Sequence, residues 1–346
     1  MSGVPPDKTA QPADPTDERS GPPGSAIFSL ERRPGAGLYL VAWLLSGAGV
    51  ALTFIGIQSQ PGLPRLLVLL GLVVLTMGLA AAAGYQTLAR AARPQTAYRG
   101  PSPVLLFFLV VVVTNLFGGV IAVVTGGNSL DVDRPDIFLV GLLIQVACYF
   151  GVVGLFVVGS RALSWREMAN AAEKSAWQIA GDVAASASIM LPLTLFVLIA
   201  GSLVALLLDA RPPQVVPVPD TALETLIAGA GAILLAPIGE ELFFRGFALK
   251  AWWRDLGPRA AIIRSAAFFA LVHVLNVQAE AGQVEVGIRS AVVLLIVLVP
   301  VGLLLGWLYV KRGLAGSITG HMTYNGIVFG LLLLSPVLPQ PAGWAA

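Results

Sequence analysis

Long apolar segments constrain the fold of this chain more than any other feature. Beyond residue 34, nine such segments follow one another, most of them close to the length that a helix needs to cross a bilayer. They cover residues 37–57, 66–88, 103–125, 137–159, 183–208, 222–250, 261–276, 291–310 and 314–338. The period-2 alternation of a transmembrane barrel is missing. The sequence therefore predicts an all-α, polytopic transmembrane helix bundle of about nine spans.

The composition supports the same class of protein. Hydrophobic residues make up 56% of the chain and charged residues only 12%, against about 25% charged residues in soluble domains. The net charge of +2 is too small to indicate a nucleic-acid partner. The single cysteine, Cys148, excludes an internal disulfide framework. The partners that we expect are the lipid bilayer and a peptide or membrane-protein substrate, with no nucleic acid.

Changes of composition divide the chain into five parts. Residues 1–34 are rich in Pro, Asp, Ser and Gly, which predicts a disordered cytoplasmic tail. Residues 35–160 form a four-helix membrane region of unknown role, and residues 161–181 form a linker. Residues 182–338 hold the spans that carry polar motifs, and residues 339–346 are a C-terminal tail.

The linker has an amphipathic pattern. Four residues fall on one face at helical spacing: Met168, Ala172, Ser175 and Ile179. Trp165 and Trp177 are typical anchors at a membrane interface. We therefore expect a helix that lies on the cytoplasmic membrane surface, with a plain polar linker as the alternative.

Basic residues alternate between the two ends of the predicted bundle. With Arg245 set aside as membrane-embedded, 16 Lys and Arg residues lie in the N-terminal tail and the even-numbered loops, against 4 in the odd-numbered loops. The positive-inside rule then places the N-terminus in the cytoplasm and the C-terminus outside. We expect a multi-pass protein of a bacterial plasma membrane.

Three polar clusters interrupt the last spans. Glu240, His273 and His321 each lie nine or ten residues from a basic residue at the predicted cytoplasmic end of their helix. A rise of 1.5 Å per residue puts all three about 13–15 Å from that end. Ionisable groups at membrane depth are costly, and these clusters use both histidines of the chain. We expect them to converge at one functional site.

Helical spacing separates the two glutamates. Glu241 lies four residues before Arg245, the favoured order for an ion pair within a helix. Glu240 points about 100° away and has no obvious partner in its own helix. Among apolar neighbours, such a carboxylate is suited to act as a general base and acid. Pro237 predicts a kink that exposes backbone carbonyls beside the site.

The other two clusters supply possible hydrogen-bond donors. His321 and Asn325 lie four residues apart on one helical face, where two donors can hold a developing oxyanion. Asn276 follows His273 by three residues and is placed to orient its imidazole ring. Each cluster alone also has a structural explanation, as a buried ion pair, a packed histidine or an interhelical hydrogen bond. Their common depth favours a functional site.

These motifs resemble those of a known family. The patterns Glu240-Glu241-x-x-x-Arg245, Phe269-x-x-x-His273 and His321-x-x-x-Asn325 look like those of the CAAX prenyl protease and bacteriocin-processing (CPBP) intramembrane proteases. The resemblance covers about residues 182–336 and says nothing about the first four spans.

The resemblance implies an intramembrane glutamic endopeptidase. Glu240 and His273 would activate a water, and His321 and Asn325 would form the oxyanion site. Structural or supporting roles would fall to the remaining members of the clusters: Glu241, Arg245, Phe269 and Asn276.

The alternatives concern cofactor and activity. We expect no cofactor, because a fixed Glu–His pair and an amide donor supply the required roles. A divalent metal such as zinc remains an alternative, since Glu240, His273 and His321 supply the three protein ligands of a catalytic zinc site. A catalytically inactive immunity or scaffold protein of the same fold is the second reading. A transporter with a proton relay is the third, and the lack of a visible inverted repeat counts against it.

Overall fold

The computed structural model of the protein describes residues 35–58, 64–125, 134–170, 174–210, 216–275 and 284–334. These residues are helical apart from turns and short loops, and they contain no strand. The predicted all-α fold is therefore confirmed for this part of the chain. The predicted terminal tails, residues 1–34 and 339–346, lie outside it.

Eight helical segments of the described residues are long and apolar enough to cross a membrane. Four precede the linker: α1 (Ala36–Gln58), α2 (Pro64–Ala89), α3 (Pro103–Val124), and α4 (Pro135–Val153) with its π-helical extension η1 (Gly154–Val158). Four follow it: α6 (Ala176–Leu208), a composite segment from α7 to α9 (Ala222–Leu256), α10 (Pro258–Leu275) and α11 (Val284–Leu334). Eight segments hold the nine predicted spans because α11 contains the last two.

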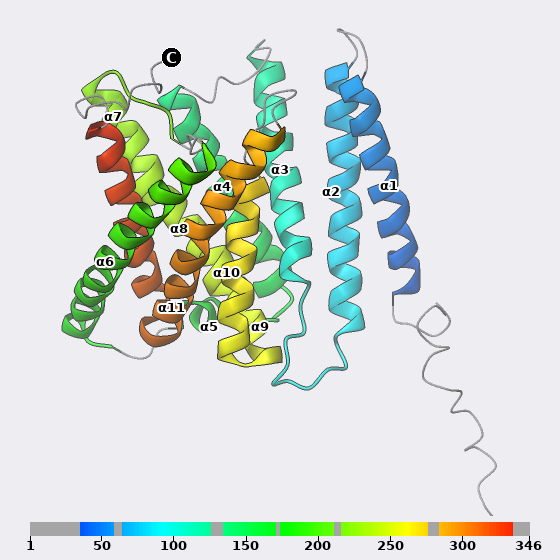
Figure 1. Ribbon diagram of the computed structural model, residues 1–346. Helices are drawn as coiled ribbons and strands as arrows, with labels where there is room; N and C mark the ends of the chain where they lie inside the picture. The colour runs from blue at the N-terminus through cyan, green and yellow to red at the C-terminus, as the bar shows by residue number, and fades with distance from the viewer. Residues whose placement is uncertain are drawn as a thin grey trace, which may run out of the picture.

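The 51-residue helix α11 is broken at Gly313, whose backbone has φ 79° and ψ −173°. Only glycine adopts this conformation without strain. In Figure 1 the chain descends through the orange part of α11 and returns through its red part. The two parts, residues 284–312 and 314–334, correspond to the eighth and ninth predicted spans.

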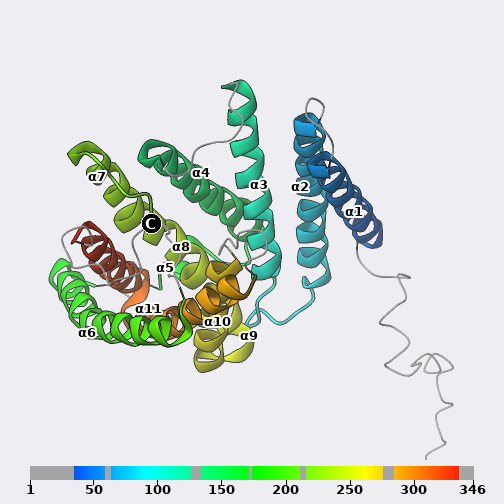
Figure 2. The same cartoon turned by 45° about the horizontal axis from the view of Figure 1, so that its top comes forward.

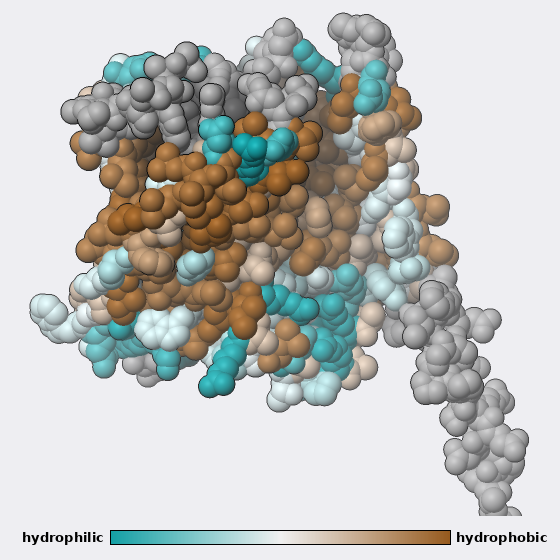
Figure 3. Space-filling view, in the orientation of Figure 1, coloured by the Kyte–Doolittle hydropathy of each residue, from teal (hydrophilic) through white to brown (hydrophobic). Residues whose placement is uncertain are grey.

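The helices form a bundle with a two-helix hairpin at its side. The hairpin of α1 and α2 packs on α3, while the remaining long helices gather around α8 (Ala236–Glu241) and α11 (Figures 1 and 2). The connections that carry most of the basic residues lie together at the lower end in Figure 1. Figure 3 shows a broad apolar belt between more polar ends, as expected for a protein that spans a bilayer.

The linker differs from the single surface helix that the sequence predicts. It holds the short helix α5 (Trp165–Ala169), which begins with a capping box between Ser164 and Glu167. Asn170 ends α5 in the left-handed conformation. A second capping box, at Ser175, starts α6. The expected helix is therefore divided into two elements, because each capping box starts its own helix.

The segment from α7 to α9 places both glutamates in the core. Two π-helical stretches, η2 (Ala230–Leu235) and η3 (Leu242–Leu249), flank α8. Pro237 lacks the N–H that would close a regular helical turn, so a local widening of the helix is expected here. The predicted kink takes the form of these π-helical turns.

Aromatic side chains fix η3 against α3 and α4. Phe243 and Phe244 are fully buried. The ring of Tyr149 lies 5.0 Å from that of Phe243, and the ring of Phe107 packs on both phenylalanines. This cluster anchors the residues that directly follow Glu240 and Glu241, so α3 and α4 help to position the glutamates.

Candidate active site

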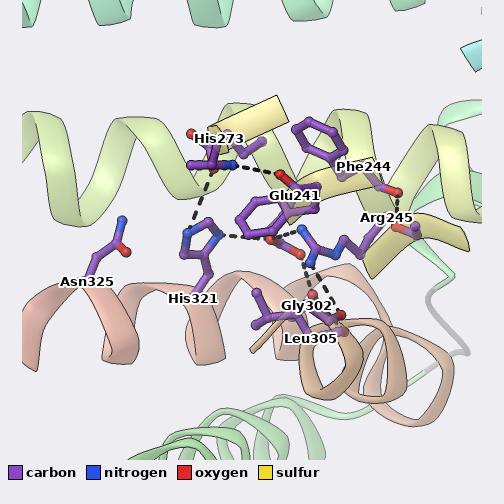
Figure 4. A network of polar contacts seen from close by, with 12 residues as sticks. Glu241, Phe244, Arg245, His273, Gly302, Leu305, His321 and Asn325 are labelled. Carbon is purple, nitrogen blue, oxygen red and sulfur yellow. Dashed lines mark hydrogen bonds and ion pairs between the residues drawn. The ribbon is translucent and has the colours of Figure 1, made fainter. Parts of the chain in front are cut away.

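Glu241 is the centre of a fully buried polar network. Its Oε1 accepts hydrogen bonds of 2.8 Å from Arg245 Nη1 and from His321 Nδ1. Its Oε2 accepts a hydrogen bond from the hydroxyl of Ser317. Glu241 and Arg245 have no solvent exposure, and His321 is only 4% exposed. The predicted ion pair therefore forms, and it also fixes the imidazole of His321 (Figure 4).

Arg245 is held by an aromatic ring as well as by the carboxylate. Its guanidinium carbon lies 4.4 Å from the centre of the Phe269 ring, a favourable cation–π arrangement. Its Nη2 donates a 3.4 Å hydrogen bond to the carbonyl of Gly302 on α11. The Phe269 ring also lies 4.4 Å from the His273 ring and 5.6 Å from the His321 ring. Phe269 thus packs against the cation and against both imidazoles.

Glu240 faces both histidines. Its Oε2 lies 3.7 Å from His273 Nε2 and 3.8 Å from His321 Nε2. Both distances exceed that of a direct hydrogen bond, so a bridging water is the natural link between these groups. Glu240 is 16% exposed and His273 27% exposed, which makes this side of the site the more accessible one.

Backbone and carboxylate oxygens fix the tautomers of the histidines. His273 Nδ1 lies 2.8 Å from the carbonyl oxygen of Phe269, and this oxygen can only accept a hydrogen bond. His321 Nδ1 faces Glu241 in the same way. When either ring is neutral, its proton is therefore on Nδ1, and its Nε2 then presents a lone pair toward Glu240.

Asn325 lies on the same helix as His321, about one turn further along (Figure 4). Its Nδ2 donates a 2.8 Å hydrogen bond to the carbonyl of Ala232, inside the π-helical stretch η2. The amide nitrogen carries two protons, so one remains for another acceptor. The π-helical stretch η2, which directly precedes the helix of Pro237, therefore supplies the carbonyl that positions Asn325.

The model of one protein family matches this region of the chain. Residues 222–327 match the model of the type II CAAX prenyl endopeptidase Rce1-like family. The family resemblance that the motifs predict is thereby confirmed for this segment. Comparison with curated proteins and with solved structures gave no match.

The Rce1-like segment begins at α7 and ends within α11, so it contains all of the predicted site residues. The structure brings three of the four predicted catalytic side chains into direct proximity: Glu240, His273 and His321. Asn325 lies on the helical face of His321 and is turned toward Ala232. Asn276, expected to orient His273, lies outside the described residues, and the carbonyl of Phe269 performs that function.

Ser317 belongs to the site but is absent from the sequence prediction. Its hydroxyl lies between Glu241 and the carbonyl of Leu305, 3.0 Å away. The signal was present in the sequence, because Ser317, His321 and Asn325 repeat at intervals of four on one helical face. Ser317 lies four residues before His321, just as Asn325 lies four residues after it, so the sequence could have predicted this serine.

Some side chains of the site are of the kinds that bind metal ions. Among the described residues, no group of three or more His, Cys, Asp and Glu side chains is arranged to hold a metal ion. The carboxylate of Glu241 is committed to Arg245, His321 and Ser317. Glu241 is therefore not available as a ligand, whereas the three residues of the zinc alternative, Glu240, His273 and His321, face one another. No catalytic step is assigned to a metal.

Proposed function

We propose that the protein is an intramembrane endopeptidase that hydrolyses a peptide bond in a peptide or membrane-protein substrate. The Rce1-like family is a protease family. The observation that carries the proposal is the arrangement of Glu240, His273 and His321. One carboxylate oxygen faces two Nε2 atoms, and each imidazole is held through its other nitrogen.

In this proposal, Glu240 and His273 activate the attacking water. The water lies between Glu240 Oε2 and His273 Nε2 and hydrogen-bonds to both. Its oxygen attacks the carbonyl carbon of the scissile bond while its proton passes to Glu240. The same proton is then delivered to the leaving amine nitrogen as the C–N bond breaks, which returns Glu240 to its carboxylate form.

His321 and Asn325 stabilise the tetrahedral intermediate. His321 acts as a donor when its Nε2 carries a proton, while Glu241 holds the ring through Nδ1. The second amide proton of Asn325 is the other donor. Fixed donors of this kind stabilise the developing oxyanion because they need no reorganisation during the reaction.

The charge pattern supports an orientation for this proposal. The end of the bundle that carries most of the described Lys and Arg residues faces the cytoplasm, with the N-terminus inside and the C-terminus outside. We place the protein in a bacterial plasma membrane and the cleavage near its cytoplasmic side.

The proposal is tested with the full-length protein reconstituted in liposomes. The probes are quenched-fluorescent peptides, half of them with a farnesylated C-terminal cysteine and half without. We expect cleavage by the wild type, and a loss of about 10²–10⁴ in kcat/KM for Glu240→Gln, the usual contribution of a general acid–base. Glu285→Gln is the matched control, because this carboxylate is 78% exposed and lies in the first turn of α11.

Two results would contradict the proposal. Cleavage that persists in both Glu240→Gln and His273→Ala would show that these residues do not carry the reaction. If the wild type cleaves no peptide and the Glu240→Gln variant functions fully in cells, the alternative of an inactive immunity or scaffold protein is supported instead.

A further inference from the structure

A second polar site lies at the basic end of the bundle, apart from the glutamates. It is a cavity of about 560 Å³ between α5, the start of α9 (Lys250–Leu256) and the end of the first part of α11. A cavity of this size is typical of small-ligand sites. Four of its lining residues are cationic: Arg166, Lys174, Lys250 and Lys311.

The carboxylates around this cavity are already committed to other cations. Glu167, the acidic residue among those lining the cavity, forms an ion pair with Arg254. It also accepts hydrogen bonds from the backbone and hydroxyl of Ser164. Burial alone would raise the pKa of Glu167, but these hydrogen bonds and Arg254 outweigh burial and lower its pKa, so Glu167 is ionised and paired.

Among the residues that the structure describes, the cations in turn exceed the carboxylates available to them. Asp182 is shared between Lys174, at 2.6 Å, and Arg312, at 2.8 Å. Lys250 donates to the neutral amide oxygen of Asn170 at 3.0 Å. Lys311 is exposed and forms no ion pair with a described residue. Positive charge therefore remains for an anionic ligand.

Buried contacts hold the wall of the cavity in place. Asn170 Nδ2 donates to the carbonyl of Tyr309 at 3.1 Å, and the hydroxyl of Tyr309 donates to the carbonyl of Met168 at 2.9 Å. A Cβ atom at Gly313 would lie 2.9 Å from the carbonyl oxygen of Asn170, so α5 fits closely against the turn of α11. The site is thus formed before a ligand binds.

The cavity lies at the level where lipid headgroups are expected. Two tryptophans of the same linker are exposed near it, Trp177 by 87% and Trp165 by 42%. Tryptophan is enriched at the boundary between headgroups and acyl chains. Basic pockets beside transmembrane helices at such a boundary are suited to anionic headgroups.

We propose that this cavity binds the phosphate group of an anionic phospholipid, with Lys311 and Lys250 as its cationic contacts. The proposal is independent of the peptidase activity, because none of these residues touches Glu240 or the histidines. It assigns the linker the function of a lipid-binding element at the rim of the bundle.

The test uses the full-length protein in neutral detergent. Short-chain phosphatidylglycerol, short-chain phosphatidylcholine and inorganic phosphate are titrated separately, and bound ligand is counted by native mass spectrometry. We expect phosphatidylglycerol to bind and phosphatidylcholine not to bind. Removal of one cation, in Lys311→Gln, should weaken phosphatidylglycerol binding about fivefold. Arg259→Gln is the control, since Arg259 is exposed at the same end but does not line the cavity.

The outcomes separate the possible ligands. Binding that weakens in Lys311→Gln, is unchanged in Arg259→Gln and decreases with salt supports the proposal. Equal weakening in both variants would overturn it, because the attraction would then come from the general charge of this end. Inorganic phosphate that binds as tightly as phosphatidylglycerol would also overturn it, in favour of a soluble phosphate. The thermal midpoint of Lys311→Gln without ligand, equal to the wild type, shows that the variant is folded.

Discussion

The α1–α2 hairpin and the helices around Glu241 are held together by different kinds of contact, the first by close glycine packing and the second by buried polar groups. In the most apolar stretches of α1 and α2, 17% of the residues are buried within the protein, against 44% in that of α11. The two hairpin helices carry no acidic residue and no histidine. They meet through glycines, as at Gly49, where a Cβ atom would lie 2.4 Å from the backbone nitrogen of Leu75.

The helices around Glu241 associate through ionised and hydrogen-bonded groups. Glu241, Arg245, His321 and Ser317 all lie in the interior, and Glu241 is hydrogen-bonded to each of the other three. Close glycine packing needs only small residues and is enough to join two helices in lipid. A buried charged network costs more free energy to assemble. Its presence around Glu241, next to Glu240, therefore indicates a functional role in addition to helix association.

The largest effect is expected from Arg245→Met, which removes the cation and leaves the Glu241 carboxylate buried. Loss of one partner of a buried ion pair costs about 3–5 kcal/mol of unfolding free energy. The measurement is chemical denaturation of the purified protein in neutral detergent.

The chain offers a matched control for Arg245. Glu285 and Arg289 form an ion pair with the same four-residue spacing nearer the surface, where Glu285 is 78% exposed and Arg289 35%. Glu285→Gln removes this ion pair from its exposed side and should change the unfolding free energy by about 1 kcal/mol or less. Similar losses in both variants would show that burial does not distinguish the two pairs.

Ser317→Ala should have an intermediate effect. The variant removes a buried hydroxyl that donates to the Glu241 carboxylate, and hydrogen bonds to charged groups contribute about 1.5–3 kcal/mol. Thermal and chemical unfolding measure the loss. Ser188→Ala is the control, because the exposed hydroxyl of Ser188 bonds only to the carbonyl of Ala184 in its own helix. If Ser188→Ala is as destabilising, Ser317 has no special role in the network.

The smallest effect is expected in the hairpin. Gly49→Ala forces α1 and α2 apart, since the new methyl group meets the backbone at Leu75, and overpacking of this kind costs about 1–3 kcal/mol. Gly47→Ala, on the same helix, meets no atom within 4 Å and should be neutral or stabilising. Peptide cleavage should be unchanged in both variants, because the hairpin does not touch the site. A loss of cleavage in Gly49→Ala alone would connect the hairpin to catalysis.

Features within a single helix were predictable from the sequence. The apolar segments predicted the spans, and the spacing of four predicted the ion pair between Glu241 and Arg245. The common distance of Glu240, His273 and His321 from basic residues predicted their convergence, which the structure confirms. These patterns are visible because helical geometry is regular and the cost of polar groups in lipid keeps such residues few.

Contacts between helices were not predictable in the same way. The link from Asn325 to Ala232 depends on the π-helical stretch η2, which changes the register of the carbonyls before Pro237. The division of the linker depends on the left-handed conformation of Asn170, which its composition did not reveal. Both features arise from local departures from helical regularity.

The reversal of the chain at Gly313 has a consequence for the last membrane crossing. His321 and Asn325 follow it by about two and three turns of continuous helix. The backbone at Gly313 packs closely against the carbonyls of Ala169 and Asn170. This contact at the end of the bundle therefore helps to fix where the side chains of His321 and Asn325 lie along and around their helix. The short helix α5, at the end of the bundle, thus contributes to the alignment of the candidate active site.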